Sequence, residues 1–266
     1  IRTRTGDLTN STLNSSNDVA ALWKRSSIDP SDILNFDFAT NYTIDLKNDK
    51  GKLVFDGNYS SGNENFEGEY QEVYYNSDAS LRNIETLDQK INNDESNSNS
   101  TFQVDYSTIL KKINVRLESG AKVILRTLDV EASSSERDTV SNNYVVDQLS
   151  NFTYSYDEQV YAGYITLGQK KGKFKYQAGV RAEQAYQLPY LVSEDTKYTN
   201  EYFEIYPSGH LKFSPKEKQE WSLSYSRRIN RPRSGQMNPF SNFSDPFNLR
   251  KGNPALKPEF IDSYDL

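Results

Sequence analysis

The sequence predicts an all-β fold, namely an antiparallel up-and-down transmembrane β-barrel, of which this chain would form a portion of roughly ten strands with long extracellular loops. Three observations predict this fold. Apolar and polar residues alternate with period two along most of the chain. The connections between these stretches are alternately short and long. Aromatic residues make up 13% of a chain that is only 35% hydrophobic. This composition is typical of a protein whose aromatic side chains lie at an interface between an apolar phase and water.

Composition excludes several other classes of protein. The 266 residues include no Cys, which excludes disulfide frameworks, zinc ribbons and iron–sulfur clusters. The single histidine, His210, argues against a His-based metal site or a Ser-His-Asp triad. A net charge of −6 argues against nucleic acid as a partner, and no stretch approaches the roughly 20 apolar residues of a membrane helix. We therefore expect no catalytic residues, no metal and no cofactor, and a protein that is not an enzyme.

The predicted strands follow in chain order from the alternation. In the longest one, Val123 and Leu125 alternate with the charged Lys122 and Arg126, so we expect the apolar series to face lipid and the charged series to face the lumen. Several strands reach the ~9–11 residues that cross a bilayer at a tilt. The predicted strands are 36–46, 53–59, 102–110, 113–125, 160–168, 174–180, 203–213, 221–230 and a last strand that begins near Glu259.

The connections predict the orientation in the membrane. The long ones are rich in Asn, Ser, Asp and Gly, and barrels of this class have short periplasmic turns and longer extracellular loops. Possible helical turns at 18–23 and 80–89 are interpreted as parts of these loops. The short connections are 47–51, 111–112, 170–172 and 215–218, and the long ones are 9–34, 61–100, 133–157, 188–200 and 230–257.

The sharpest local motif begins at the end of the strand that stops at Asn230. Asn-Pro and Asp-Pro pairs initiate turns, and Pro258 fixes the backbone where the last strand begins. The motif residues are Arg227, Arg228, Asn230, Arg231, Pro232, Asn238, Pro239, Asp245, Pro246, Gly252, Asn253, Pro254, Leu256, Pro258 and Glu259. This run resembles the Bacteroidetes outer-membrane β-barrel family of TonB-dependent receptors, and residues 161–164, 172–183 and 203–208 also match that family.

The resemblance implies a fold, a location and partners. Family members have a signal peptide, a plug domain and a barrel of about 22 strands in the bacterial outer membrane. Residues 1–266 would then be an internal part of one barrel domain, with the plug, signal peptide and terminal strands outside it. The implied partners are outer-membrane lipid, the plug and remaining strands of the same parent chain, and an inner-membrane energy-transducing complex. A surface lipoprotein is a further candidate partner.

The implied function is uptake of an extracellular ligand whose identity the sequence leaves open. Two alternatives remain: a non-transporting barrel that serves as a structural partner in an envelope assembly, and a soluble glycan-binding β-sandwich. We interpret the motif loop as a structural brace. Arg227 and Arg228 are adjacent, so strand alternation sends them to opposite faces. Arg228 shares the polar parity of Ser224 and Ser226, and we expect it to point inward and to pair with Glu259 or Asp245.

Overall fold

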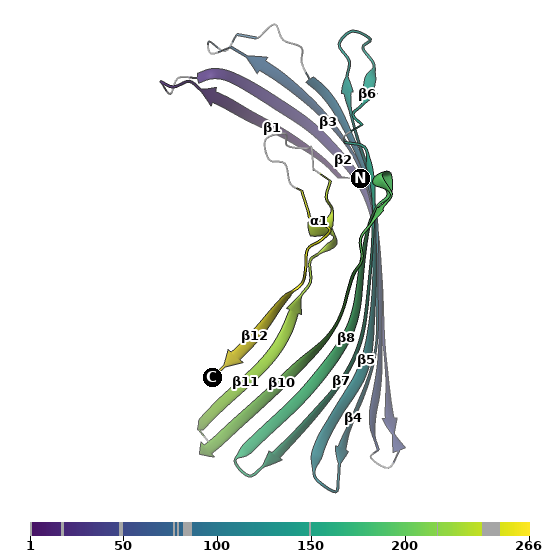
Figure 1. The fold of residues 1–266 in the computed structure, drawn as a ribbon, viewed down its shortest axis with the longest axis vertical. Helices are drawn as coiled ribbons and strands as arrows, with labels where there is room; N and C mark the ends of the chain where they lie inside the picture. Colours follow the sequence, from purple (N-terminus) through teal and green to yellow (C-terminus); the bar gives the residue numbers. More distant parts are fainter. Residues whose placement is uncertain are drawn as a thin grey trace.

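The computed structural model is a single curved β-sheet (Figure 1). It describes residues 2–16, 19–47, 50–76, 78, 80–81, 87–148, 150–216, 218–240 and 251–266. Within these residues, no helix has the length and apolar character needed to cross a membrane. The strands of this sheet make up most of the described chain, which confirms the all-β prediction.

Ten strands follow one another across the described part of the sheet, as the alternation predicted. Each of them pairs antiparallel with its neighbours in the chain, in the order β1-β2-β3-β4-β5-β7-β8-β10-β11-β12. The short strands β6 (Tyr144–Val146) and β9 (Thr196–Lys197) pair with β5 and β8. The ten strands are β1 (Arg2–Leu13), β2 (Val19–Leu46), β3 (Gly51–Tyr75), β4 (Leu87–Leu110), β5 (Val115–Arg137), β7 (Phe152–Lys171), β8 (Phe174–Leu191), β10 (Asn200–Lys216), β11 (Gln219–Asn230) and β12 (Glu259–Asp265).

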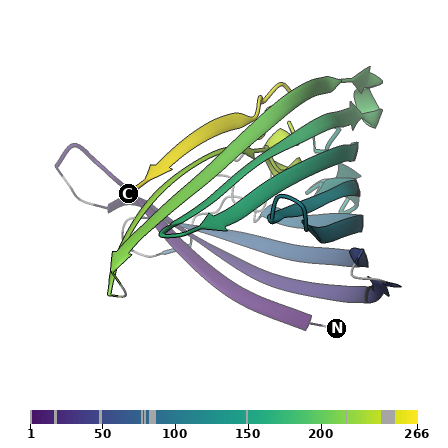
Figure 2. The same cartoon turned by 90° about the horizontal axis from the view of Figure 1, so that it is seen from below.

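The sheet is an open trough in the described residues. Seen along its strands, it curves through part of a circle, with β1 at one edge and β12 at the other (Figure 2). Tight turns join the strands at one end of the trough, which we call the turn end, and longer connections lie at the opposite loop end (Figure 1). A short helix, α1 (Ser234–Met237), lies inside the concave face.

Side chains alternate between the convex and concave faces, and the convex face carries an apolar belt. In β5, Val123 and Leu125 lie on the convex face, whereas Lys122 and Arg126 lie on the concave face. The belt side chains stay exposed in the isolated chain, as shown by the 55% exposure of Phe36 on β2. A barrel in a membrane buries such side chains in lipid and turns its polar face to the lumen, so the predicted assignment of faces agrees with the structure.

The belt ends abruptly towards the loop end. On β5, the apolar convex residues run from 115 to 125, and the next two convex residues are Thr127 and Asp129. On the neighbouring β7, the change falls between Tyr161 and Gln159, which pair with Val123 and Leu125. The eleven residues from 115 to 125 match the ~9–11 residues of a tilted membrane-crossing strand. The strands therefore continue well beyond the bilayer at the loop end.

Two predicted long loops are wrong for this reason. Residues 9–34 and 61–100 are mostly strand, because β1, β2, β3 and β4 continue past the belt. Polar residues occupy both faces there, so the hydropathy pattern fades although the backbone ladder continues. Residues 19–23 are strand and not helix, and 87–89 open β4. Residues 17–18, 82–86 and two single positions between 76 and 80 lie outside the described residues. Strand β1, at 2–13, was not predicted.

The remaining long connections lie where they were expected, and two of the three are shorter than predicted. The connection at 133–157 narrows to 138–151 and contains β6, and that at 188–200 contains a 3₁₀ turn, Val192–Glu194, and β9. The connection at 230–257 contains α1. The short connections all fall at the turn end, as predicted.

Candidate functional site

The chain leaves β11 and folds back into the concave face, where residues 231–240 form what we call the inner segment (Figure 1). Its first turn is closed by two bonds between Arg233 and Gln236: the Gln236 N–H donates to the Arg233 carbonyl, and the Arg233 N–H donates to Gln236 Oε1, each at 2.9 Å. The Tyr154 hydroxyl of β7 donates to the Ser234 carbonyl at 3.4 Å. The segment is therefore attached to the barrel wall as well as to itself.

An apolar cluster seats the inner segment on the wall. Met237 is fully buried (0% exposed) among side chains of β5, β7 and β8. Phe240 stacks on Phe152 of β7, with ring centroids 4.0 Å apart and planes 8° from parallel. The buried members of this cluster are Val130, Ala132, Phe152, Tyr154, Tyr156, Leu191 and Met237. Because this cluster lies beyond the lipid belt, it is a lumenal core that water would otherwise reach.

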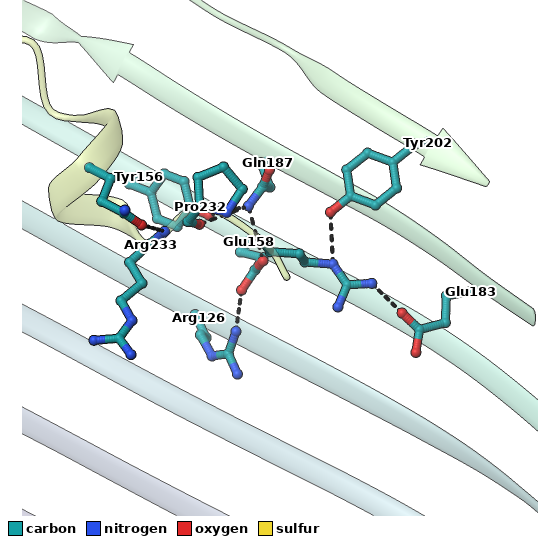
Figure 3. A network of polar contacts seen from close by, with 10 residues as sticks. Arg126, Tyr156, Glu158, Glu183, Gln187, Tyr202, Pro232 and Arg233 are labelled. Atoms are coloured by element: carbon teal, nitrogen blue, oxygen red, sulfur yellow. Dashed lines mark hydrogen bonds and ion pairs between the residues drawn. The ribbon is translucent and has the colours of Figure 1, made fainter. Parts of the chain in front are cut away.

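A polar network fixes the start of the inner segment next to this cluster (Figure 3). The Arg231 guanidinium forms an ion pair with Glu183 of β8 and donates to the Tyr202 hydroxyl of β10 at 2.7 Å. Glu183 is 5% exposed and also pairs with Arg181. A carboxylate held by two guanidinium groups keeps its charge in a buried place because both partners offset the lost hydration.

The second half of the network is centred on Gln187, which is fully buried. Its Nε2 donates to the Tyr156 hydroxyl at 2.9 Å, to Glu158 at 3.2 Å and to the Pro232 carbonyl at 3.4 Å (Figure 3). Glu158 in turn pairs with Arg126 of β5. Burial raises the pKa of the Tyr156 hydroxyl, which keeps it protonated. The network therefore connects β5, β7 and β8 to the backbone of the inner segment.

The later motif residues close the inner segment from the other side. The Asn200 side chain of β10 donates to the Pro254 carbonyl at 3.2 Å. The Gly252 N–H donates to the Asn238 carbonyl at 2.8 Å, and the Asn253 N–H donates to the Gln236 carbonyl at 2.8 Å. A Cβ on Gly252 would lie 2.4 Å from the carbonyl oxygens of both Gln236 and Asn238, so only glycine fits there.

Turn-forming side chains explain several other motif positions. Asn253 Oδ1 accepts from the Ala255 N–H at 2.9 Å, and the Leu256 N–H donates to the Asn253 carbonyl at 3.1 Å. Asn238 Oδ1 accepts from the Phe240 N–H at 3.0 Å, across Pro239. Both asparagines thus form local turns of the type that asparagine favours.

The boundary of the motif with β12 is also in place. Pro258 directly precedes the first residue of β12, Glu259, as the sequence indicated. Asp245 and Pro246 lie outside the described residues.

The two adjacent arginines lie on opposite faces of β11, as expected. Arg227 is on the convex face, opposite Asp262 and with its guanidinium 5.1 Å from the Phe260 ring centre. Arg228 is on the concave face, opposite Ile261. Among the described residues, Arg228 forms no ion pair with Glu259, which instead accepts from the Asn230 side chain at 3.2 Å.

The predicted pairing of Arg228 with Asp245 stays a prediction, because Asp245 lies outside the described residues. The bracing ion pair that the structure shows is formed by Arg231, three residues further along the chain. Sequence reasoning included Arg231 in the motif but missed its partners Glu183 and Tyr202, and it missed Glu158 and Gln187. One signal for them was present in the sequence. Each of these wall residues lies on the lumen-facing side of its strand, at or just beyond the end of the belt.

A second polar cluster braces the wall nearer the loop end. The side chain of Arg25 on β2, 4% exposed, pairs with Glu72 of β3 and donates to Gln89 of β4 at 2.8 Å. Gln89 donates to Ser134 of β5 at 2.8 Å. This chain of contacts crosses four neighbouring strands, so it holds their mutual curvature.

Two cavities flank the inner segment. One, of about 540 Å³, lies between it and the wall of β4, β5 and β7, and its lining includes Arg126, Glu158, Arg231 and Arg233. The other, of about 360 Å³, lies beside the apolar cluster and includes Phe240. His210 is on the concave face of β10, and among the described residues no group of three or more His, Cys, Asp or Glu side chains is placed to hold a metal.

An antiparallel meander with an apolar convex belt and a polar, partly filled lumen defines the wall of a membrane-spanning β-barrel. The comparison with protein families agrees, because the model of the outer membrane protein beta-barrel family matches residues 44–266. The chain belongs to that family, and its place is therefore the outer membrane. This assignment sets aside the soluble β-sandwich.

Other comparisons add little about function. Among solved structures, the chain is similar to the ferric citrate transporter FecA in the unliganded form, with 11% sequence identity and a TM-score of 0.43. The similarity covers 85% of this chain and 36% of that one, so this chain spans about a third of its length. No curated protein matches the sequence.

Proposed function

We propose that this chain is part of the barrel of a TonB-dependent receptor that takes up an extracellular ligand, and that it has no enzymatic activity. The observation that carries the proposal is the inner segment, which enters the lumen near the loop end and leaves a polar cavity beside it. A purely structural barrel has no need of a charged lumenal cavity near the side from which a solute would enter.

The proposed partners follow from the same arrangement. The apolar belt lies in outer-membrane lipid. The open edges at β1 and β12 are completed by remaining strands of the parent chain, because lipid offers no hydrogen-bond partners to a sheet edge. The motif residues resemble those of Bacteroidetes TonB-dependent receptors. On that resemblance we propose a plug domain in the same chain, an inner-membrane energy-transducing complex, and a surface lipoprotein as a further partner.

Solute depletion from the growth medium tests this function. The parental strain, a strain lacking the parent gene and a strain lacking the inner-membrane complex are grown in one defined nutrient mixture. We expect at least one solute to be depleted by the parental strain only. If all three strains deplete the medium alike, transport is refuted. Co-purification of the full-length protein with other envelope proteins would then favour the structural partner.

A further inference from the structure

The cavity of about 540 Å³ beside the inner segment has the size of a small-molecule site. Its lining comes from β4, β5, β7 and the first residues of the inner segment. The backbone ladder joins β4, β5 and β7. The contacts of Gln187 and Arg231 fix the inner segment to β7 and β8. The cavity therefore has preformed walls.

The lining offers a guanidinium group that can pair with an anionic group. The cavity is lined by three guanidinium groups, of Arg126, Arg231 and Arg233, and by two carboxylates, of Glu95 and Glu158. Arg231 forms an ion pair with Glu183, and Arg126 forms an ion pair with Glu158. Among the described residues, the Arg233 guanidinium has no ion-pair partner, and Figure 3 shows it extending to the same side of the network as Arg126. The six charges, three guanidinium groups and the carboxylates of Glu95, Glu158 and Glu183, balance in sum. Among the described residues, however, Arg233 and Glu95 are the two charged groups of the lining that have no ion-pair partner, so the Arg233 guanidinium is available to an anionic group.

An unpartnered acceptor lies on β4, directly across the strand pair from Arg126. Asn99 Oδ1 is buried and, within the part of the chain that is described, has no hydrogen-bond partner. Asn97 and Ser98 line the cavity next to it. A buried acceptor without a partner destabilises the folded protein, and a hydroxyl of a bound molecule would relieve that cost.

We propose that this cavity binds a small hydroxylated solute that carries one carboxylate or phosphate group. Arg233 and the free side of Arg126 pair with the anionic group, and Asn99 accepts a hydrogen bond from a hydroxyl of the solute. This assignment rests on the proposed uptake function and names its substrate class. The other occupant to be tested is an acidic side chain of the plug.

Equilibrium dialysis of the full-length protein in detergent tests the assignment with D-glucuronate, D-glucose 6-phosphate and D-glucose. We expect saturable binding of at least one of the two acids, and at least tenfold weaker binding of glucose. Arg233→Gln should weaken binding of that acid at least tenfold. The matched control is Arg228→Gln, which removes the same charge from the concave face away from the cavity and should change the affinity less than twofold.

A salt titration of the unaltered protein gives a second measurement that needs no variant: binding of the acid should weaken with NaCl. Binding of glucose as tight as that of the acids, or equal effects of the two substitutions, would overturn the assignment. The absence of saturable binding of both acids would also overturn the assignment. So would an increase in bilayer conductance caused by Arg233→Gln, because that increase is expected if a plug carboxylate occupies the cavity. Failure here with solute depletion intact would leave transport standing, so the two failures are distinguishable.

Discussion

Replacing Arg231 with alanine should destabilise the barrel through the loss of two contacts. The ion pair with Glu183 involves a nearly buried carboxylate, and a hydrogen bond to a charged group contributes about 1.5–3 kcal/mol. The bond to the Tyr202 hydroxyl adds about 0.5–1.5 kcal/mol. Glu183 keeps Arg181 as a partner, so the full cost of about 3–5 kcal/mol for an uncompensated buried charge is not reached. We expect a loss of about 2–4 kcal/mol in the free energy of unfolding.

Urea unfolding of the full-length protein in lipid vesicles measures this loss. Arg231→Lys keeps the charge but cannot reach both partners in a planar fork, so its loss should be smaller. Arg228→Ala is the matched control, because among the described residues Arg228 has no ion pair, and it should cost under about 0.5 kcal/mol. A double-mutant cycle with Glu183→Ala should give a coupling of at least about 1 kcal/mol. Equal losses for Arg231→Ala and Arg228→Ala would refute the reasoning.

Three further predictions concern the membrane, the topology and the pH dependence. Val123→Arg should cost about 2–4 kcal/mol of barrel stability while Lys122→Ala costs little, as measured by urea unfolding, because only the first places a charge in lipid. On whole cells, an impermeant maleimide should label the V140C variant, whose site is 93% exposed at the loop end, and spare K171C; the reverse pattern would invert the orientation. Glu95 has a raised pKa because of burial and the nearby Glu64, so its folded form binds protons more tightly than its unfolded form and stability falls as pH rises above its ordinary pKa. Glu95→Gln should therefore raise the melting temperature at pH 7 and lose that advantage at pH 4, and no gain at pH 7 would contradict the assignment.

The fold was predictable where one face of a strand meets lipid. An alternating pattern is produced when one face of a strand meets an apolar phase and the other a polar one. Val123 and Leu125, which alternate with Lys122 and Arg126, show this pattern. Beyond the belt that signal disappears. In the β3–β4 ladder, Asn63 pairs with Ser96 and Asn97 pairs with Gly62, although asparagine disfavours strands. Their conformation is set by the register of the lipid-facing part of the same strands. A short stretch of sequence does not reveal that register, so these stretches were predicted to be loops.

The site was predictable as a motif but not as a network. The turn-forming role of Asn238, Asn253 and Pro258 follows from local chemistry. The partner of Arg231 does not, because Glu183 lies 48 residues away and meets it only after the inner segment folds back onto β8. Strand parity alone favoured Arg228, yet it is Arg231, one residue past the end of β11, that reaches the Glu183 carboxylate.

The meander also implies an order of assembly. Each strand of the wall pairs with its neighbour in the chain, so only short connections have to be closed when these pairs form. Contacts between residues that are close in sequence form early in folding. The inner segment is different: the bond from Tyr154 to Ser234 spans 80 residues, and the surface that receives Met237 exists only once β5, β7 and β8 are side by side. The lumen must therefore pass through a wider, unobstructed stage during biogenesis, and it narrows only in a late docking step.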